Sequence, residues 1–206
     1  MWGILAKIVA VCFVTASVIL LIKKRAEKGR IRRAALLFAS ILAALYVGIF
    51  PIENLFLSFA SAEEVFQYAC RGQLLGIAGG TASDLIVYET GNHTFSFMVA
   101  PKSPDGYKIG HFFSLKKVTY VADSGYSLTI YRDVGGTDNY VLLHGFTARG
   151  TPQITDEYGS DFAVFTLTVE ESTSVVPFVA FAHLADFDGA YLLTINGEQF
   201  LTVEGP

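Results

Sequence analysis

Two apolar stretches near the N-terminus, separated by a short basic segment, constrain this chain more than any other feature. The first, residues 2–22, has 21 residues, and the second, residues 34–50, has 17 before Pro51. At about 1.5 Å per residue, helices of these lengths measure about 31 and about 25 Å, and the hydrocarbon core of a membrane is about 30 Å thick. The apolar Ile52 lengthens the second stretch. We therefore predict a hairpin of two transmembrane helices, over residues 2–22 and 34–52.

The segment between the two stretches, residues 23–33, sets the expected topology. It carries seven basic residues against one acid, Glu27, so its net charge is +6. Short loops rich in Lys and Arg stay on the cytoplasmic side of a membrane, which places both chain termini outside the cytoplasm. A basic run also occurs on nucleic-acid-binding surfaces, but a loop held between two spans favours the topological role. The residues that determine this topology are Lys23, Lys24, Arg25, Lys28, Arg30, Arg32 and Arg33.

Small residues repeat every four positions in the second apolar stretch, at Ala35, Ala39 and Ala43. Residues of this kind let two helix backbones approach closely. We expect them to pack the hairpin, and the alternative is a helix-mediated homo-oligomer.

Ala60-Ser61-Ala62 offers an alternative to a permanent anchor. The sequence resembles a signal-peptidase site, and cleavage after Ala62 would release the rest of the chain. About ten residues separate it from the apolar stretch, and a preceding span is unusual for a signal peptide. The anchored, two-span membrane protein is therefore the main prediction.

The region from Ser58 to the C-terminus differs from the anchor in charge and cysteine content. It has seventeen acids and seven bases, a net charge of −10 with histidine neutral. This charge disfavours binding to nucleic acid and permits a cationic partner or a metal. Cys70 is its only cysteine, so no disulfide forms within it, and its stability must come from a hydrophobic core.

Most of this region reads as β-strand. Ser61, followed by two acids, begins a short helix from Ala62 to about Cys70. Asn196-Gly197 is the strongest hairpin signal, because both residues tolerate positive φ. We expect three parts: the transmembrane hairpin over 1–57, a short helix with a β meander over 58–110, and an antiparallel β sandwich or barrel over 111–206. The expected strands are 74–78, 84–89, 94–100, 117–122, 126–132, 140–146, 162–170, 175–182, 191–195 and 199–203.

Three segments carry a resemblance to a known group of proteins. They are Ser-Ala-Glu-Glu-Val-Phe at 61–66, Ser-Asp-Leu-Ile-Val-Tyr at 83–88, and Pro-Lys-Ser-Pro-Asp-Gly-Tyr-Lys-Ile-Gly at 101–110. They resemble uncharacterised membrane-anchored proteins of Gram-positive bacteria with a small extracytoplasmic domain. The resemblance implies an anchored envelope protein and carries no activity with it.

The polar residues provide no catalytic motif. His93, His111, His144 and His183 lack the spacing that places two imidazoles on one metal, and no serine-hydrolase motif is present. Cys70 ends a helix, where the dipole opposes a thiolate, so a buried structural thiol is expected. The metal candidates that remain are His183, Asp186 and Asp188, although Asp-Gly turns explain the two acids without a metal. We predict no cofactor and no enzymatic activity.

These observations favour a membrane-tethered extracytoplasmic β domain that is not an enzyme. Besides the lipid bilayer, its expected partner is a protein or a component of the cell envelope. Two alternatives remain open: a metal-dependent envelope enzyme or binding module that uses His183, Asp186 and Asp188, and a small subunit of a larger membrane complex.

Overall fold

A computed structural model describes residues 51–91, 94–111, 114–123, 125–135, 137–148, 150–166, 175–185, 187 and 189–203, together with the single positions 15, 19 and 38. The chain divides into two compact units, residues 1–57 and 58–206. Apart from positions 15, 19 and 38 and the last two residues of the second span, both predicted membrane spans fall outside the described residues, as do the basic loop and the small residues Ala35, Ala39 and Ala43. Within the described part of the chain, no helix is long and apolar enough to cross a membrane.

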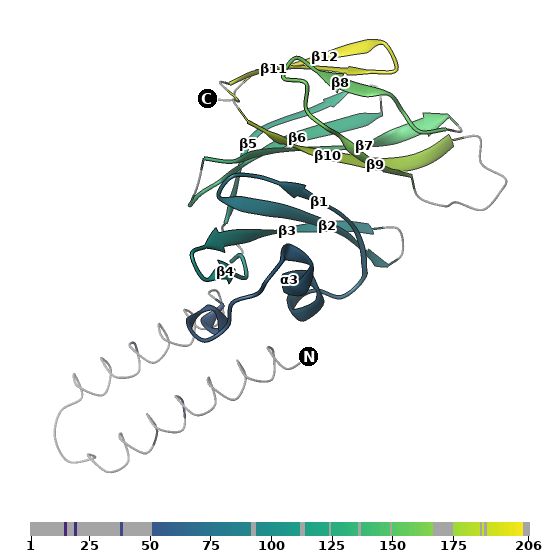
Figure 1. Cartoon of the computed structure of the whole chain (residues 1–206). Coiled ribbons are helices and arrows are strands. Elements are labelled where there is room, and N and C mark those ends of the chain that lie inside the picture. Colours follow the sequence, from purple (N-terminus) through teal and green to yellow (C-terminus); the bar gives the residue numbers. More distant parts are fainter. Residues whose placement is uncertain are drawn as a thin grey trace. The chain divides into compact units, whose positions relative to one another are not determined.

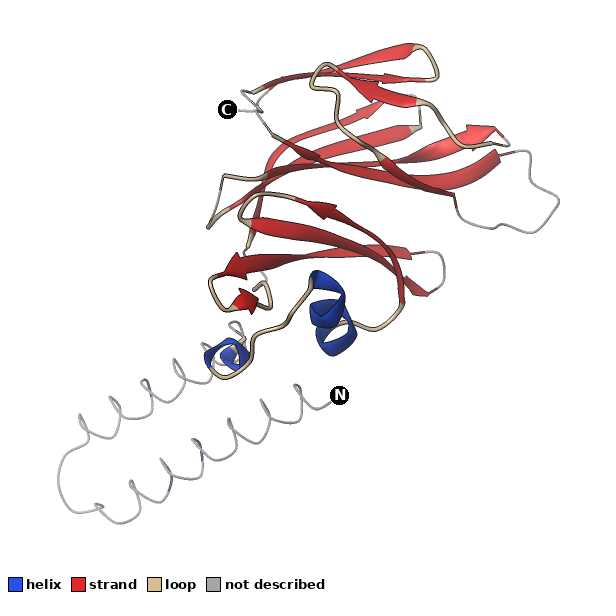
Figure 2. Cartoon of the chain, in the orientation of Figure 1, coloured by secondary structure: helices blue, strands red, loops and turns tan. Residues whose placement is uncertain are grey.

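The described chain is mainly β, as predicted (Figure 2). A short 3-10 helix, η1 (Ile52–Leu55), ends the first unit, and the helix α3 (Ala62–Ala69) opens the second. The strands that follow are β1 (Gln73–Gly79), β2 (Ser83–Gly91), β3 (Thr94–Ser103), β4 (Gly106–Tyr107), β5 (Leu115–Asp123), β6 (Tyr126–Asp133), β7 (Asn139–Ala148), β8 (Ile154–Asp156), β9 (Ala163–Thr166), β10 (Val175–Leu184), β11 (Ala190–Ile195) and β12 (Glu198–Val203).

The strands form three antiparallel sheets, with the orders β1-β2-β3-β4, β5-β6-β7-β10-β9 and β12-β11-β8. Each of the ten predicted strands overlaps an observed one. The prediction missed β4 and β8, which have two and three residues and are too short for a period-2 pattern to be visible.

The five-stranded sheet lies between the other two and is covered on both faces (Figure 1). On β10, Phe178, Ala180 and Ala182 face the three-stranded sheet, while Val179 and Phe181 face the four-stranded sheet. Successive side chains of a strand point to opposite faces, so a run of apolar residues fits a strand buried on both sides. His183 follows the period of Val179 and Phe181, which directs it toward the four-stranded sheet.

The four-stranded sheet is also covered on both faces. Leu85 and Val87 of β2 belong to the core shared with the five-stranded sheet, whereas Ile86 packs with α3. The helix contributes Val65 and Phe66, both buried. Stacking of α3 and the three sheets therefore builds the hydrophobic core that a region without disulfides requires.

Two local signals are confirmed by the backbone. The Ser61 side chain accepts a hydrogen bond from the backbone N–H of Glu64 at 3.3 Å, which caps α3. Asn196 and Gly197 have φ values of 50° and 89°, as a type I′ turn between β11 and β12 requires.

Candidate functional site

Asp138, the last residue before β7, holds the tight turn between β1 and β2. Its Oδ1 accepts a hydrogen bond from the backbone N–H of Thr81 at 2.8 Å. Its Oδ2 accepts from the N–H groups of Ala82 at 2.7 Å and Ser83 at 2.8 Å, and from the Ser83 hydroxyl at 3.3 Å. Consecutive amides directed at one point make an anion-binding concavity, which this carboxylate fills. One side chain thereby ties the four-stranded sheet to the five-stranded sheet.

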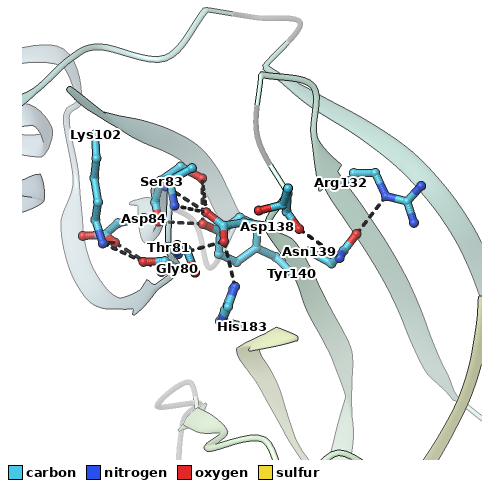
Figure 3. Close-up of polar contacts among 12 residues, drawn as sticks. Gly80, Thr81, Ser83, Asp84, Lys102, Arg132, Asp138, Asn139, Tyr140 and His183 are labelled. Atoms are coloured by element: carbon cyan, nitrogen blue, oxygen red, sulfur yellow. Dashed lines mark hydrogen bonds and ion pairs between the residues drawn. The ribbon is translucent and has the colours of Figure 1, made fainter. Parts of the chain in front are cut away.

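His183, on β10, binds the same carboxylate (Figure 3). Its Nε2 lies 3.0 Å from Oδ1 of Asp138, and the side chains of the two residues are 20% and 2% exposed. An ionised carboxylate only accepts hydrogen bonds, so Nε2 carries the hydrogen in this contact. Asp138 therefore fixes the orientation of the imidazole ring.

Asp138 is ionised despite its burial. Burial opposes the charged form and by itself raises the pKa of this carboxyl group. The hydrogen bonds from the three backbone amides and from His183 outweigh burial, and the pKa of Asp138 lies below its ordinary value. The donors thus stabilise the negative charge. The carboxylate occupies the place that a bound anion takes in an anion-binding site.

Tyr140 makes a second link between the same two sheets. Its hydroxyl donates to the carbonyl of Ser83 at 2.8 Å and lies 2.8 Å from the hydroxyl of that residue. Burial raises the pKa of Tyr140, which keeps its phenol protonated as a donor. A Cβ placed on Gly80 would come within 2.6 Å of the Tyr140 hydroxyl oxygen and 2.7 Å of Cγ of Asp138. A larger residue at this position would force the Tyr140 or Asp138 side chain to shift.

Lys102, on β3, supports the turn from the other side. Its Nζ lies 2.8 Å from Oδ1 of the buried Asp84 and donates to the carbonyl of Gly80 at 2.6 Å. The contact with Asp84 raises the pKa of Lys102. Asp138 and the Lys102–Asp84 pair therefore both hold the Gly80–Ser83 turn through side-chain contacts.

An open cleft of about 400 Å³ borders His183. Strand β9 pairs with β10 only as far as the pair Ala163 and Phe181, so in the described structure β10 has no neighbour on this side at His183. Across the cleft from His183 lies β1, the outer strand of the four-stranded sheet, which contributes residues 77–79 to the lining. The residues that line the cleft are Ile77, Ala78, Gly79, Asp161, Phe162, Ala163, Phe181 and His183.

Of the three metal candidates from the sequence, the structure describes His183 alone. Asp186 and Asp188 lie outside the described residues. Within the described ranges, no three side chains of His, Cys, Asp or Glu come together in a way that could hold a metal ion. His144, on β7, packs its ring against Phe95 at a centroid distance of 5.5 Å, and burial lowers its pKa.

Cys70 lies directly after α3, inside a cluster of side chains. Its thiol donates to the sulfur of Met98 at 3.0 Å, and burial raises its pKa. These features agree with a structural thiol and distinguish Cys70 from an activated nucleophile.

Three residues of the site, Asp138, Tyr140 and Asp161, are not recognisable as site residues from the sequence. Asp138 follows a Gly-Gly turn and precedes an apolar strand, which reads as turn chemistry and gives no sign of partners on β1, β2 and β10. Asp161 stands in an irregular segment, where the sequence has no period that places it. Comparison of the chain with models of known families, with curated proteins and with solved structures gives no match.

Proposed function

We propose that this chain is a membrane-tethered protein whose β domain, residues 58–206, lies outside the cytoplasm and binds a protein or another envelope component. The proposal assigns binding to the cleft beside His183 and assigns no catalysis to it. One observation carries it: an open cleft of about 400 Å³ has a lining that is more polar than apolar in exposed surface, and it includes the side chains of Asp161 and His183. Polar groups that converge on a cleft fix the orientation of a ligand and provide specificity.

Hydrogen bonds from one carboxylate order two parts of the cleft walls, which favours a role in binding. Asp138 fixes the imidazole of His183, and the same carboxylate fixes the turn that follows β1. A site whose groups are already ordered loses little conformational entropy when a ligand binds. Because Asp138 accepts five hydrogen bonds, its charge serves to hold the walls in place.

The tether is supported by the sequence and by the residues that follow the second apolar stretch. Leu55 and Phe56 are 78% and 83% exposed, which is unusual for large apolar side chains and suits the interface of a bilayer. Ala62 is 3% exposed and is the first residue of α3. Cleavage after Ala62 would separate this helix from its cap at Ser61, so the anchored form is favoured over a released domain.

Membrane extraction and protease access test the tether. The full chain, with an epitope at its C-terminus, is expected to remain in membranes washed with alkaline carbonate. A protease added to spheroplasts is expected to remove the epitope while a cytoplasmic marker survives. Release by carbonate, or an epitope protected until lysis, would refute the tether.

Site-specific crosslinking tests the cleft. A photoreactive phenylalanine analogue at Phe162, on the cleft wall, is compared with the same analogue at Tyr120, which is 55% exposed on β5 at the opposite edge of the five-stranded sheet. We expect a crosslinked envelope component from position 162 and none from position 120. Equal crosslinking at both positions, or none at 162, would show that the cleft is not the binding site.

A further inference from the structure

We infer that the occupant of the cleft is an extended polypeptide segment with a basic side chain, which adds a strand to the outer edge of β1. This inference rests on the proposed binding function and names the class of partner. Three observations support it. The outer edge of β1 borders the cleft, β1 has no charged residue or proline, and an acid, Asp161, lies on the wall opposite β1.

The outer edge of β1 faces the cleft. In the described structure β1 pairs only with β2, and its register is regular from Gly76, opposite Val87, to Gly79, opposite Asp84. Alternate residues of an antiparallel strand direct their N–H and C=O groups to opposite sides. Half of these groups on β1 therefore point away from β2. Because Ile77, Ala78 and Gly79 line the cleft, this edge borders open space.

Strand β1 lacks the charged residues that usually protect an edge. Its sequence, Gln-Leu-Leu-Gly-Ile-Ala-Gly, contains neither a charge nor a proline. By contrast β5, an edge strand of the five-stranded sheet, carries Lys116 and Lys117, both exposed. Proteins place lysine or proline on exposed edges to prevent pairing with other chains, so an unprotected edge beside a cleft suits a partner strand. The bulge between Leu74 and Gly76 limits pairing to the stretch from Gly76 onward.

The acid on the wall opposite β1 favours a basic side chain in the bound segment. Asp161 is exposed and lines the cleft, and the residues from Ser58 onward carry a net charge of −10. A Lys or Arg side chain can place its aliphatic stem against Phe162 and its charge near Asp161. An acidic segment would meet repulsion both from Asp161 and from the domain as a whole.

Four synthetic peptides test the inference on the full chain in lipid nanodiscs. The first is a labelled octapeptide, Ser-Thr-Val-Thr-Lys-Val-Thr-Ser. The second peptide replaces this Lys with Glu. The third and fourth peptides keep Lys and carry N-methyl groups on alternate backbone amides. In the third peptide these amides lie along one edge of the strand, and in the fourth they lie along the other edge. Fluorescence anisotropy measures binding, and hydrogen exchange measured by mass spectrometry reports protection of residues 73–79.

We expect the Lys peptide to bind and to slow exchange in residues 73–79. Methylation of the edge that pairs with β1 removes several backbone hydrogen bonds and is expected to weaken binding by about tenfold or more. Asp161→Asn is expected to weaken binding of the Lys peptide about two- to fivefold, as for one solvated ion pair. The matched control is Asp105→Asn, which makes the same charge change in the turn between β3 and β4, at the far edge of the four-stranded sheet.

Three results would overturn the inference: equal binding of the Lys and Glu peptides, equal binding of both methylated peptides and the parent, or no protection of residues 73–79. Protection of the cleft by a glycan fragment of the cell wall, with none by peptides, would also overturn it. The crosslinking experiment tests the proposed function by itself. That function is rejected if the photoreactive residue at Phe162 captures nothing in cells. Capture at Phe162 combined with any of the results above therefore rejects only the extended basic segment.

Discussion

Replacing Asp138 with Asn tests the link between the two sheets at its centre. The amide keeps one oxygen, and its best placement is at Oδ2, where Ala82 and Ser83 donate. Its NH₂ group then stands where Oδ1 accepted from Thr81 at 2.8 Å, so two donors face each other. His183 can accept from the NH₂ group only in its other tautomer.

The magnitude follows from these contacts. A buried N–H without a partner costs about 1–3 kcal/mol, and the two remaining backbone bonds, from Ala82 and Ser83, lose their charge assistance at about 1 kcal/mol each. Removing a buried charge returns part of this cost. We expect the free energy of unfolding to fall by about 2–4 kcal/mol, a large share of the roughly 5–15 kcal/mol of an ordinary domain.

Urea unfolding of the full chain in nanodiscs, followed by near-UV circular dichroism of tyrosine, measures this loss. Tyrosine is the suitable probe because the sole tryptophan is Trp2, outside the β domain. Asp105→Asn is the matched control and should leave the midpoint nearly unchanged. A loss below about 0.5 kcal/mol for Asp138→Asn, the size of an ordinary surface substitution, would refute the account of this carboxylate.

The same comparison has a defined pH dependence. The folded pKa of Asp138 is lowered from its ordinary value of 3.8, so its charge stabilises the fold above the unfolded pKa. That stability is lost as the pH falls through the folded pKa. The difference in unfolding free energy between the parent and Asp138→Asn should therefore shrink as the pH falls below about 3.8. A difference that grows as the pH falls below this value would contradict the assignment.

Three further substitutions or reactions follow from the same geometry. Gly80→Ala should lower the unfolding free energy by about 1–3 kcal/mol, because the new Cβ would lie 2.6 Å from the Tyr140 hydroxyl oxygen. The control Gly135→Ala should change it little, because no atom lies nearer than 4.0 Å to its Cβ. Equal effects of the two substitutions would contradict the close packing of the turn at Gly80. Tyr140→Phe should lower the unfolding free energy from a thermal melt by about 1–2 kcal/mol, since the carbonyl of Ser83 loses the phenol donor and keeps the N–H of Gly80, and a neutral result would argue against the phenol bond. Cys70 should react with a maleimide more slowly than free cysteine at pH 8, because burial raises its pKa; a rate as fast as that of the free thiol would disprove its burial.

The elements of the β domain were accessible from the sequence because each rests on a local pattern. Alternating or continuous apolar runs predicted β2, β3, β7 and β10, and Asn196-Gly197 predicted the last hairpin, where backbone conformation depends on two residues. Ser61 predicted the start of α3 for the same reason, because a cap bonds to an amide three residues away.

The site was not accessible, because its contacts are not local. Asp138 binds amides that are 55 to 57 positions away and an imidazole 45 positions away. Those partners meet only when the two sheets stack, and no sequence period reports which residues of stacked sheets face each other. His183 was named from its proximity in sequence to Asp186 and Asp188, whereas the carboxylate that orients it comes from the turn before β7.

Cysteine labelling in intact cells tests the central claim, a tethered extracytoplasmic domain that binds through its cleft. In a chain with Cys12→Ala and Cys70→Ala, Phe162→Cys is compared with Tyr120→Cys, using a maleimide that cannot cross membranes. The account predicts that both positions are labelled without lysis. It also predicts that Phe162→Cys reacts markedly more slowly in cells than in the purified protein, while Tyr120→Cys reacts equally in both. Labelling that requires lysis, or an unchanged rate at Phe162→Cys, would contradict the account.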